Sequence, residues 1–345
     1  MVDQRGVSER YARQTRFPGI GRAGQERLRS AVVVVVGCGA LGSAVIDLLA
    51  RAGFGELRIA DRDVVELSNL QRQLLFDESD ARAGAPKAVA AAQAVGRINS
   101  EVHVTPLVMD VTPGNVESLV SGATVVVDGT DNLETRYLVN DACVKLGIPW
   151  VYGGAIGSTG MSMTIVPGET ACFRCLFPDM AAAGTLETCE TAGVLASTVV
   201  TVAAHQWTEV TKLVVGARDH LSAGLLALDV WTNDHTVISG IARRADCPCC
   251  VLGHYEFLDA RATSRTASLC GRDAIQISPG VPTRIDLPGL GRRLASAGPV
   301  VVNEYLVRFT VGPHELTVFV DGRAIVKGTV DPAEARSVYA RWVGI

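Results

Sequence analysis

The chain alternates short apolar runs with longer segments whose apolar residues recur at helical spacing. Between residues 31 and 153, five runs rich in β-branched residues predict strands: VVVVV, ELRIAD, VHVTPLVM, TVVVDGT and PWVYGG. Strands that are apolar along their whole length are typical of a parallel sheet covered on both faces. Helical patterns such as AVIDLLARAG separate them. We therefore expect successive βαβ units in a doubly wound, mostly parallel α/β sheet.

The pattern changes twice after residue 153. GMSMTIVPG, LLALDVW and HTVISGI predict added antiparallel strands, and residues 191–215 have the length and the apolar face of a helix. Beyond residue 255, VVVNEYLVRFTV and HELTVFVDGRAIVKG predict further strands, and DPAEARSVYARWVG predicts a final helix. We divide the chain into a domain of residues 1–255 and a small α+β domain of residues 256–345.

Composition narrows the class of protein. The 345 residues are 48% hydrophobic and 20% charged, which suits an enzyme with two cores. A formal net charge of -4 and the lack of a basic run argue against nucleic acid as a partner. The longest apolar run, residues 192–204, is shorter than the roughly 18 residues that a membrane span needs. The N-terminal segment is polar and shows no secretory signal, so we expect a cytoplasmic protein.

Three glycines follow the first predicted strand in the pattern GxGxxG. Gly37 permits a tight turn, Gly39 lets backbone amides approach a phosphate, and Gly42 lets the next helix pack on the strand. Asp61 ends the following strand, where a carboxylate can accept the hydroxyls of a ribose. This arrangement predicts a Rossmann-like nucleotide site, and NAD and adenosine nucleotides satisfy it equally.

The residues beyond that strand favour ATP. Donors and acceptors gather in DRDVVELSNLQRQLLF and GAPKAVAAAQ, namely Asp63, Asn69, Arg72, Gln73 and Lys87. Arg72 and Lys87 can neutralise a triphosphate and the charge that develops when its α-phosphorus is attacked. A nicotinamide site has no need of such donors.

Two carboxylates follow another predicted parallel strand, in VVVDGTDN. Ligands of open α/β sheets bind at the carboxyl ends of the strands. Asp131 could therefore hold Mg²⁺ between phosphates, and its neighbour Asp128 is the alternative ligand.

Nine cysteines in a chain without a visible signal indicate metal or thiol chemistry rather than disulfides. Two CxxC pairs supply the ligands of a structural tetrahedral Zn²⁺: Cys172, Cys175, Cys247 and Cys250. Cys249, inside CPCC, is an alternative to Cys250. A site closed by four thiolates has no open position for catalysis. Cys38 and Cys143 are expected to pack in the interior.

Cys189 is different because it lies in a small and polar loop, FPDMAAAGTLETCETAG. A helix that begins near Thr191 could lower the pKa of this thiol and make it a nucleophile. The single cysteine of the tail, Cys270, stands in SLCGRDAIQI, which lacks the character of a sulfurtransferase loop. We expect the tail to be a docking or dimer-stabilising module.

Eight segments, in order over residues 9–251, resemble the ubiquitin-activating type of adenylyltransferases, specifically the bacterial ThiF and MoeB enzymes: RYARQ, GCGALGS, DRDVVELSNLQRQ, APK, DGTDN, CFRC, TCETAGV and CPCC. The resemblance implies an attack of a carrier protein's C-terminal glycine carboxylate on the α-phosphate of ATP, which gives an acyl-adenylate and pyrophosphate. The implied partner is a ubiquitin-like sulfur carrier ending in Gly-Gly, for thiamine, molybdopterin or another sulfur transfer. A cysteine desulfurase or sulfurtransferase would donate the sulfur.

The resemblance also implies roles for single residues. Gly39 would contact the nucleotide and Asp61 the ribose. The phosphates would fall to Asn69, Arg72 and Lys87, and Mg²⁺ and catalysis to Asp131. Arg13 would reach the γ-phosphate from the partner subunit, which makes the expected enzyme a homodimer. Cys189 would join the activated carrier as a thioester or acyl-disulfide.

Three other functions compete with this prediction. A relative could adenylate a different carboxylate, such as a peptide end or a tRNA-linked threonyl group. An NAD-dependent oxidoreductase is disfavoured because the chain has no Tyr-x-x-x-Lys pair and no use for two CxxC pairs. A binding partner that has lost the site is disfavoured by the joint presence of Arg13, Arg72, Lys87 and Asp131.

Overall fold

The computed structural model describes residues 9–131, 133–179, 192–259, 266–269, 273–278 and 284–343. The chain forms two compact units, Met1–Ala260 and Arg261–Ile345. The division falls five residues beyond the expected one because helix α10 (Glu256–Asp259) packs against the first unit. The Phe257 ring stacks on Tyr137 at 4.7 Å, and its backbone N–H donates to Asp141 at 2.9 Å.

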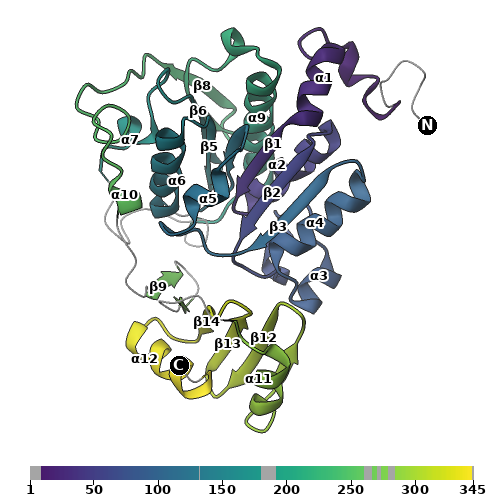
Figure 1. Ribbon diagram of the computed structural model, residues 1–345, viewed down its shortest axis with the longest axis vertical. Helices are drawn as coiled ribbons and strands as arrows, with labels where there is room; N and C mark the ends of the chain where they lie inside the picture. Colours follow the sequence, from purple (N-terminus) through teal and green to yellow (C-terminus); the bar gives the residue numbers. More distant parts are fainter. Residues whose placement is uncertain are drawn as a thin grey trace. The chain divides into compact units, whose positions relative to one another are not determined.

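An eight-stranded sheet organises the first unit (Figure 1), in the order β3-β2-β1-β4-β5-β6-β7-β8. The strands β1 to β5 are parallel, whereas β6, β7 and β8 are antiparallel additions. The strands are β1 (Val32–Val36), β2 (Glu56–Asp61), β3 (His103–Val108), β4 (Val125–Asp128), β5 (Trp150–Ile156), β6 (Thr159–Ile165), β7 (Gly224–Asp229) and β8 (Asp234–Ser239). The predicted doubly wound α/β sheet with added antiparallel strands is confirmed.

Helices cover both faces of the sheet (Figure 1). The alternating valines of β1 explain this, because Val33 and Val35 join one buried cluster and Val34 and Val36 the other. One cluster includes residues of α1 (Gly21–Ser30), α2 (Ala40–Ala52), α4 (Lys87–Ile98) and α9 (Ala196–Val215). The other includes residues of α5 (Val116–Val120), α6 (Leu133–Leu146), α7 (Phe173–Leu176) and α10. The short α3 (Glu78–Ala83) precedes α4.

Helix α9 begins at Ala196, about five residues later than its apolar pattern predicts. Just before it, Val194 forms a β-bridge with Gly157, and the N–H of Leu195 donates to the carbonyl of Gly157. The extended backbone at these residues therefore takes the place of a first helical turn.

The second unit is the expected α+β arrangement with its own antiparallel sheet, in the order β11-β12-β13-β14-β10-β9. Its elements are β9 (Thr266–Leu269), β10 (Ala274–Ile277), α11 (Leu287–Leu294), β11 (Val300–Val302), β12 (Leu306–Val311), β13 (His314–Phe319), β14 (Ala324–Lys327) and α12 (Pro332–Trp342). The run VVVNEYLVRFTV is two strands, because the Asn303 side chain accepts the N–H groups of Tyr305 and Leu306 in a turn. Along the part of the chain that the structure describes, no helix combines the length and apolar character needed to cross a bilayer.

Candidate active site and metal centre

The glycine turn lies where the strand order reverses, between β1 and β4. Gly37 has a φ of +88°, and a Cβ there would lie 2.7 Å from the carbonyl oxygen of Gly129, just after β4. A Cβ on Gly42 would lie 2.0 Å from the carbonyl oxygen of Gly37. Only glycine fits these close backbone contacts. The loops after β1 and β4 therefore meet at the switch point, which is the ligand position in open α/β sheets.

Gly39 caps the N-terminus of α2 and leaves it accessible to a ligand. Among the described residues, a Cβ on Gly39 would have one neighbour within 4 Å, the Gly129 oxygen at 3.9 Å, so the space above this residue is open. The first turn of a helix has amide donors without intrahelical acceptors and a positive dipole end. The turn thus presents donors where a phosphate can approach.

Asp61, at the end of β2, connects two loops through backbone amides. Its Oδ2 accepts the N–H of Cys38 at 2.6 Å, and its Oδ1 accepts the N–H of Asp63 at 2.7 Å. Burial raises the pKa of Asp61, while the positive charge of Lys87 acts in the opposite direction. The carboxylate has further lone pairs, which suit the two hydroxyls of a ribose.

Lys87, the first residue of α4, is buried beneath the same edge. Only 3% of its side chain is exposed, and its Nζ lies 3.2 Å from Oδ2 of Asp63. Its backbone N–H also donates to the carbonyl of Asp63 at 2.9 Å. A buried ammonium is costly unless it is paired. The pair therefore holds a positive charge beside Asp61, within the group that the sequence predicted.

Asn69, Arg72 and Gln73 come from a short helical turn that begins with η3 (Leu67–Asn69). Asn69 is buried, and its Oδ1 accepts the N–H of Glu66 at 3.1 Å. Gln73 is buried too, whereas Arg72 is half-buried and donates to the Ser68 carbonyl at 2.9 Å. Of the three, Arg72 thus has the side chain with most freedom to follow a ligand.

The structure separates the two candidate metal ligands after β4. Asp128 is 2% exposed, and both of its carboxylate oxygens accept hydrogen bonds from the protein. Asp131 lies three residues further along and is exposed. Asp128 is therefore occupied within the fold, and Asp131 is the carboxylate available to a ligand.

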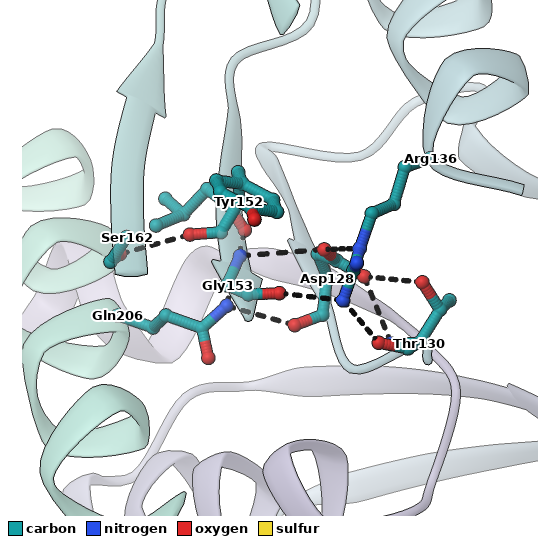
Figure 2. Close-up of polar contacts among 8 residues, drawn as sticks. Asp128, Thr130, Arg136, Tyr152, Gly153, Ser162 and Gln206 are labelled. Atoms are coloured by element: carbon teal, nitrogen blue, oxygen red, sulfur yellow. Dashed lines mark hydrogen bonds and ion pairs between the residues drawn. The ribbon is translucent and has the colours of Figure 1, made fainter. Parts of the chain in front are cut away.

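Two residues that the sequence did not single out hold this edge together, Arg136 and Gln206 (Figure 2). Arg136 pairs with Asp128 at 2.9 Å, and Gln206 Nε2 donates to the Asp128 carbonyl at 2.8 Å. The available sequence signal for Arg136 is a charged residue directly before the apolar run of α6, whose residues 137–143 are buried. Gln206 left no such signal within a long helix.

The remaining predicted residues lie elsewhere. Arg13 occupies the turn before η2 (Gln14–Arg16), and its side chain is exposed. Among the described residues, no hydrogen bond or ion pair joins that side chain to the glycine turn. Cys189 and Cys270 lie outside the described residues.

Four cysteines meet in one buried cluster of the first unit. The sulfurs of Cys172, Cys175, Cys247 and Cys250 all lie within 4.8 Å of one another. Three of the separations are 3.5, 3.6 and 3.9 Å. Zn–S bonds of about 2.3 Å in a tetrahedron require sulfurs about 3.8 Å apart. The donor set therefore fits Zn²⁺, and the backbone N–H of Arg244, 3.4 Å from Cys175 Sγ, can share the charge of a thiolate.

Cys249 lies beside this cluster rather than in it. It is buried, and the Asn140 side-chain amide donates to its sulfur at 3.2 Å. The same Asn140 accepts the N–H of Phe173 through Oδ1 at 2.9 Å. The four-sulfur group that could hold a metal thus includes Cys250, and Cys249 lies between this group and Asn140 of α6. Cys38 and Cys143 are fully buried, and burial raises the pKa of both thiols, which leaves them unreactive.

The chain is similar to several known proteins. The model of the ThiF family matches residues 11–249. The chain is 42% identical to the "Sulfur carrier protein ThiS adenylyltransferase" of Bacillus subtilis, over 98% of this chain and 100% of that one. It is 41% identical to the "SAMP-activating enzyme E1" of Haloferax volcanii, over 73% and 92% of the two chains.

Solved structures share the fold. A crystal structure of E. coli MccB with ATP aligns with a TM-score of 0.61 and 24% identity, over 71% of this chain and 75% of that one. The Bacillus subtilis alignment covers 340 residues and therefore includes the second unit, whereas the Haloferax volcanii alignment covers 251. The similarity to the Bacillus subtilis protein thus extends over both units, whereas the similarity to the Haloferax volcanii protein covers 73% of the chain.

Proposed function

The chain belongs to the ThiF family, and on that basis we propose that it adenylylates the C-terminal glycine carboxylate of a ubiquitin-like sulfur carrier of the ThiS or MoaD type with ATP. The observation that carries the proposal is the group of polar residues at the carboxyl edge of β1, β2 and β4. The paired ammonium of Lys87, the carboxylate of Asp61 and the exposed carboxylate of Asp131 lie around one glycine turn, which supports the assignment of phosphate, ribose and metal contacts to them. Names of three relatives, including the "Adenylyltransferase and sulfurtransferase MOCS3" of Bos taurus, support this activity.

In the reaction, a carboxylate oxygen of the carrier attacks the α-phosphorus of ATP. An O–P bond forms, the bond between the α-phosphorus and the bridging oxygen breaks, and pyrophosphate leaves with the bonding electrons. Such transfers depend on positioning and on neutralising phosphate charge. We assign Asp61 to the ribose, and Asn69, Arg72 and Lys87 to the phosphates. Gly37, Gly39 and Gly42 shape the turn, and Asp63 and Gln73 support it.

Asp131 is the residue that we assign to Mg²⁺. The ion would neutralise charge on the phosphates and on the leaving pyrophosphate. The exposed position of Asp131, beside a fully engaged Asp128, supports this choice. The four-cysteine cluster would bind Zn²⁺ as a structural ion that takes no part in the adenylyl transfer.

Further parts of the proposal concern partners. Arg13 would complete the phosphate site of a second subunit in a homodimer, and its exposed side chain supports such a role. Cys189 would receive the activated carrier as a thioester or acyl-disulfide, with a cysteine desulfurase or sulfurtransferase as the sulfur donor. We place the reaction in the cytoplasm and assign the second unit to carrier docking.

Exchange of pyrophosphate into ATP tests the proposal. Purified protein with Mg²⁺ should catalyse exchange only when a carrier ending in Gly-Gly is added, because the reverse reaction needs the acyl-adenylate. Asp131→Ala serves as the matched control. Exchange without any carrier, or equal exchange by Asp131→Ala, would contradict the proposed reaction.

A further inference from the structure

A buried arginine joins three separate segments at the carboxyl edge of the sheet (Figure 2). The Nε of Arg136, on α6, donates to Oδ2 of Asp128 at 2.9 Å. Its Nη2 donates to the carbonyl of Thr130 at 2.6 Å and to that of Gly153, on β5, at 3.0 Å. Only 11% of the Arg136 side chain and 2% of that of Asp128 are exposed. The guanidinium therefore ties the loop after β4 to the neighbouring strand.

The same loop is held from inside by the other carboxylate oxygen. Oδ1 of Asp128 accepts both the N–H of Thr130 at 2.9 Å and its hydroxyl at 2.7 Å. Gly129, between them, touches the glycine turn, because a Cβ there would lie 2.4 Å from the Gly37 oxygen. The loop thus has little room to move without breaking hydrogen bonds or a backbone contact.

Gln206 supports the end of β4 and the start of β5 from α9, which packs on the opposite face from α6. Its Nε2 donates to the carbonyls of Asp128 at 2.8 Å and Val151 at 3.3 Å (Figure 2). A Cβ on Gly153 would lie 2.4 Å from that nitrogen, so the amide fits closely beneath the strand. Helices on both faces therefore hold one loop of three residues.

We propose that Arg136 is a positioning residue, whose buried pair with Asp128 fixes this loop and so holds the Asp131 carboxylate at the metal and phosphate position. The inference rests on the proposed adenylyl transfer. Arg136 acts through Asp131 and does not itself touch the nucleotide. Its loss should weaken metal-dependent steps and leave metal-free ATP binding unchanged.

Lysine cannot replace this arginine. The guanidinium is a planar fork that donates from Nε and Nη2 to three acceptors, whereas lysine offers one nitrogen on a flexible stem. Arg136→Lys therefore keeps the charge opposite Asp128 and loses the geometry. Thr130 provides a milder pair of variants, because Thr130→Val removes the hydroxyl that Asp128 accepts and Thr130→Ser keeps it.

Arg58→Lys is a matched control on β2. In the wild type, the Nε of Arg58 lies 2.8 Å from Oε1 of Glu56 and its Nη1 donates to the Ser121 carbonyl at 2.8 Å. Arg58 therefore also joins a carboxylate and a carbonyl. It lies in the amino-terminal half of the strand, away from the carboxyl edge. A general cost of losing an arginine fork would affect both variants.

The experiment measures ATP affinity by calorimetry with and without Mg²⁺, together with exchange rates and melting temperatures. We expect Arg136→Lys to keep metal-free ATP affinity within about twofold, to lose about fivefold of the tightening by Mg²⁺, and to lose about 10- to 100-fold in exchange kcat. Thr130→Val should lower the tightening by Mg²⁺ and the exchange kcat by about threefold each, as expected for the loss of one hydrogen bond. Thr130→Ser and Arg58→Lys should match the wild type.

Three results would overturn the inference. In the first, Arg136→Lys folds and Mg²⁺ tightens its ATP binding as much as in the wild type. In the second, Arg136→Lys loses metal-free ATP binding in parallel with its melting temperature, and in the third, Mg²⁺ does not tighten ATP binding by the wild type. If Arg136→Lys does not fold, equal behaviour of Thr130→Val and Thr130→Ser decides against it. Failure of the wild type to exchange pyrophosphate contradicts the proposed function instead, while the Mg²⁺ comparison still tests the positioning role.

Discussion

The first unit contains two polar centres that are built in opposite ways. The four-cysteine cluster uses one residue type, supplied by two short segments and buried at Cys172, Cys175 and Cys247. The carboxyl edge of the sheet uses glycines, carboxylates, an amide and cations from the ends of several strands and helices. In the cluster every residue offers the same donor atom, a sulfur, whereas at the edge each residue offers a different chemical group.

The difference separates stability from activity. Thiols that surround a metal contribute through a closed coordination shell, so their loss is measured in unfolding. At the edge, the buried charges are paired within the protein, as in Lys87 with Asp63 and Arg136 with Asp128. Asp131 is exposed and Arg72 is half-buried, so both side chains are more accessible than these paired charges. Substitutions there should divide into those that unfold and those that only inactivate.

The largest expected effect is on the cluster. Cys175→Ala should lower the unfolding free energy of the first unit by at least about 5 kcal/mol, because structural Zn²⁺ contributes about 10–16 kcal/mol in small zinc peptides. Urea unfolding with zinc analysis checks this. Cys143→Ala, at a buried cysteine outside the cluster, should cost only about 1 kcal/mol. Equal losses of unfolding free energy in the two variants would contradict a structural Zn²⁺ at the four-cysteine cluster.

The next effect concerns the two aspartates of the loop after β4. Asp131→Ala should reduce pyrophosphate exchange by about 10²–10³-fold, or about 3–4 kcal/mol, with unfolding free energy changed by less than about 0.5 kcal/mol. Asp128→Ala should instead cost about 3–5 kcal/mol of stability, because it leaves Arg136 buried without its carboxylate. Exchange assays and urea unfolding of both variants measure the contrast. A destabilised Asp131→Ala protein would contradict the division.

Two glycines of the turn should show a smaller contrast of the same kind, in which one substitution lowers stability and the other weakens ATP binding. Gly42→Ala puts a Cβ 2.0 Å from the Gly37 oxygen and should cost about 1–3 kcal/mol of unfolding free energy. Gly39→Ala meets no described atom nearer than 3.9 Å and should stay within about 1 kcal/mol of the wild type in unfolding free energy, with weakened ATP binding as its main effect. Thermal unfolding and calorimetry with ATP distinguish them. The reverse order of stabilities is the result that this account excludes.

The smallest effect is expected for the second unit. Deletion of residues 260–345 keeps α10, which packs on α6 through Phe257 and Tyr137. We expect the KM for the carrier to rise about fivefold, or about 1 kcal/mol, and the KM for ATP to stay within about twofold. Steady-state exchange kinetics of the truncated and full chains measure both. Unchanged carrier kinetics would dismiss the docking role.

Much of the fold could be predicted because its signals are local. The valines of β1 and the other continuous apolar runs predicted parallel strands, and each was found where expected. The start of α9 was not predicted correctly, because pairing of Val194 with Gly157 overrides an apolar pattern that continues into the helix. The boundary between the units moved for a similar reason, since Phe257 packs on a ring more than a hundred residues earlier in the chain.

The sequence by itself determined which residue types take part: the glycine turn, the carboxylates that end the strands, the two CxxC pairs and the family to which they belong. These follow from spacing along the chain, which secondary structure converts directly into position. Only the tertiary structure decided that Asp128 pairs inward and Asp131 faces out, that Cys250 rather than Cys249 completes the thiol set, and that Arg136 and Gln206 hold the edge. Each of these outcomes depends on atoms brought together from distant segments, where hydrogen-bond geometry and burial rather than spacing select the partner.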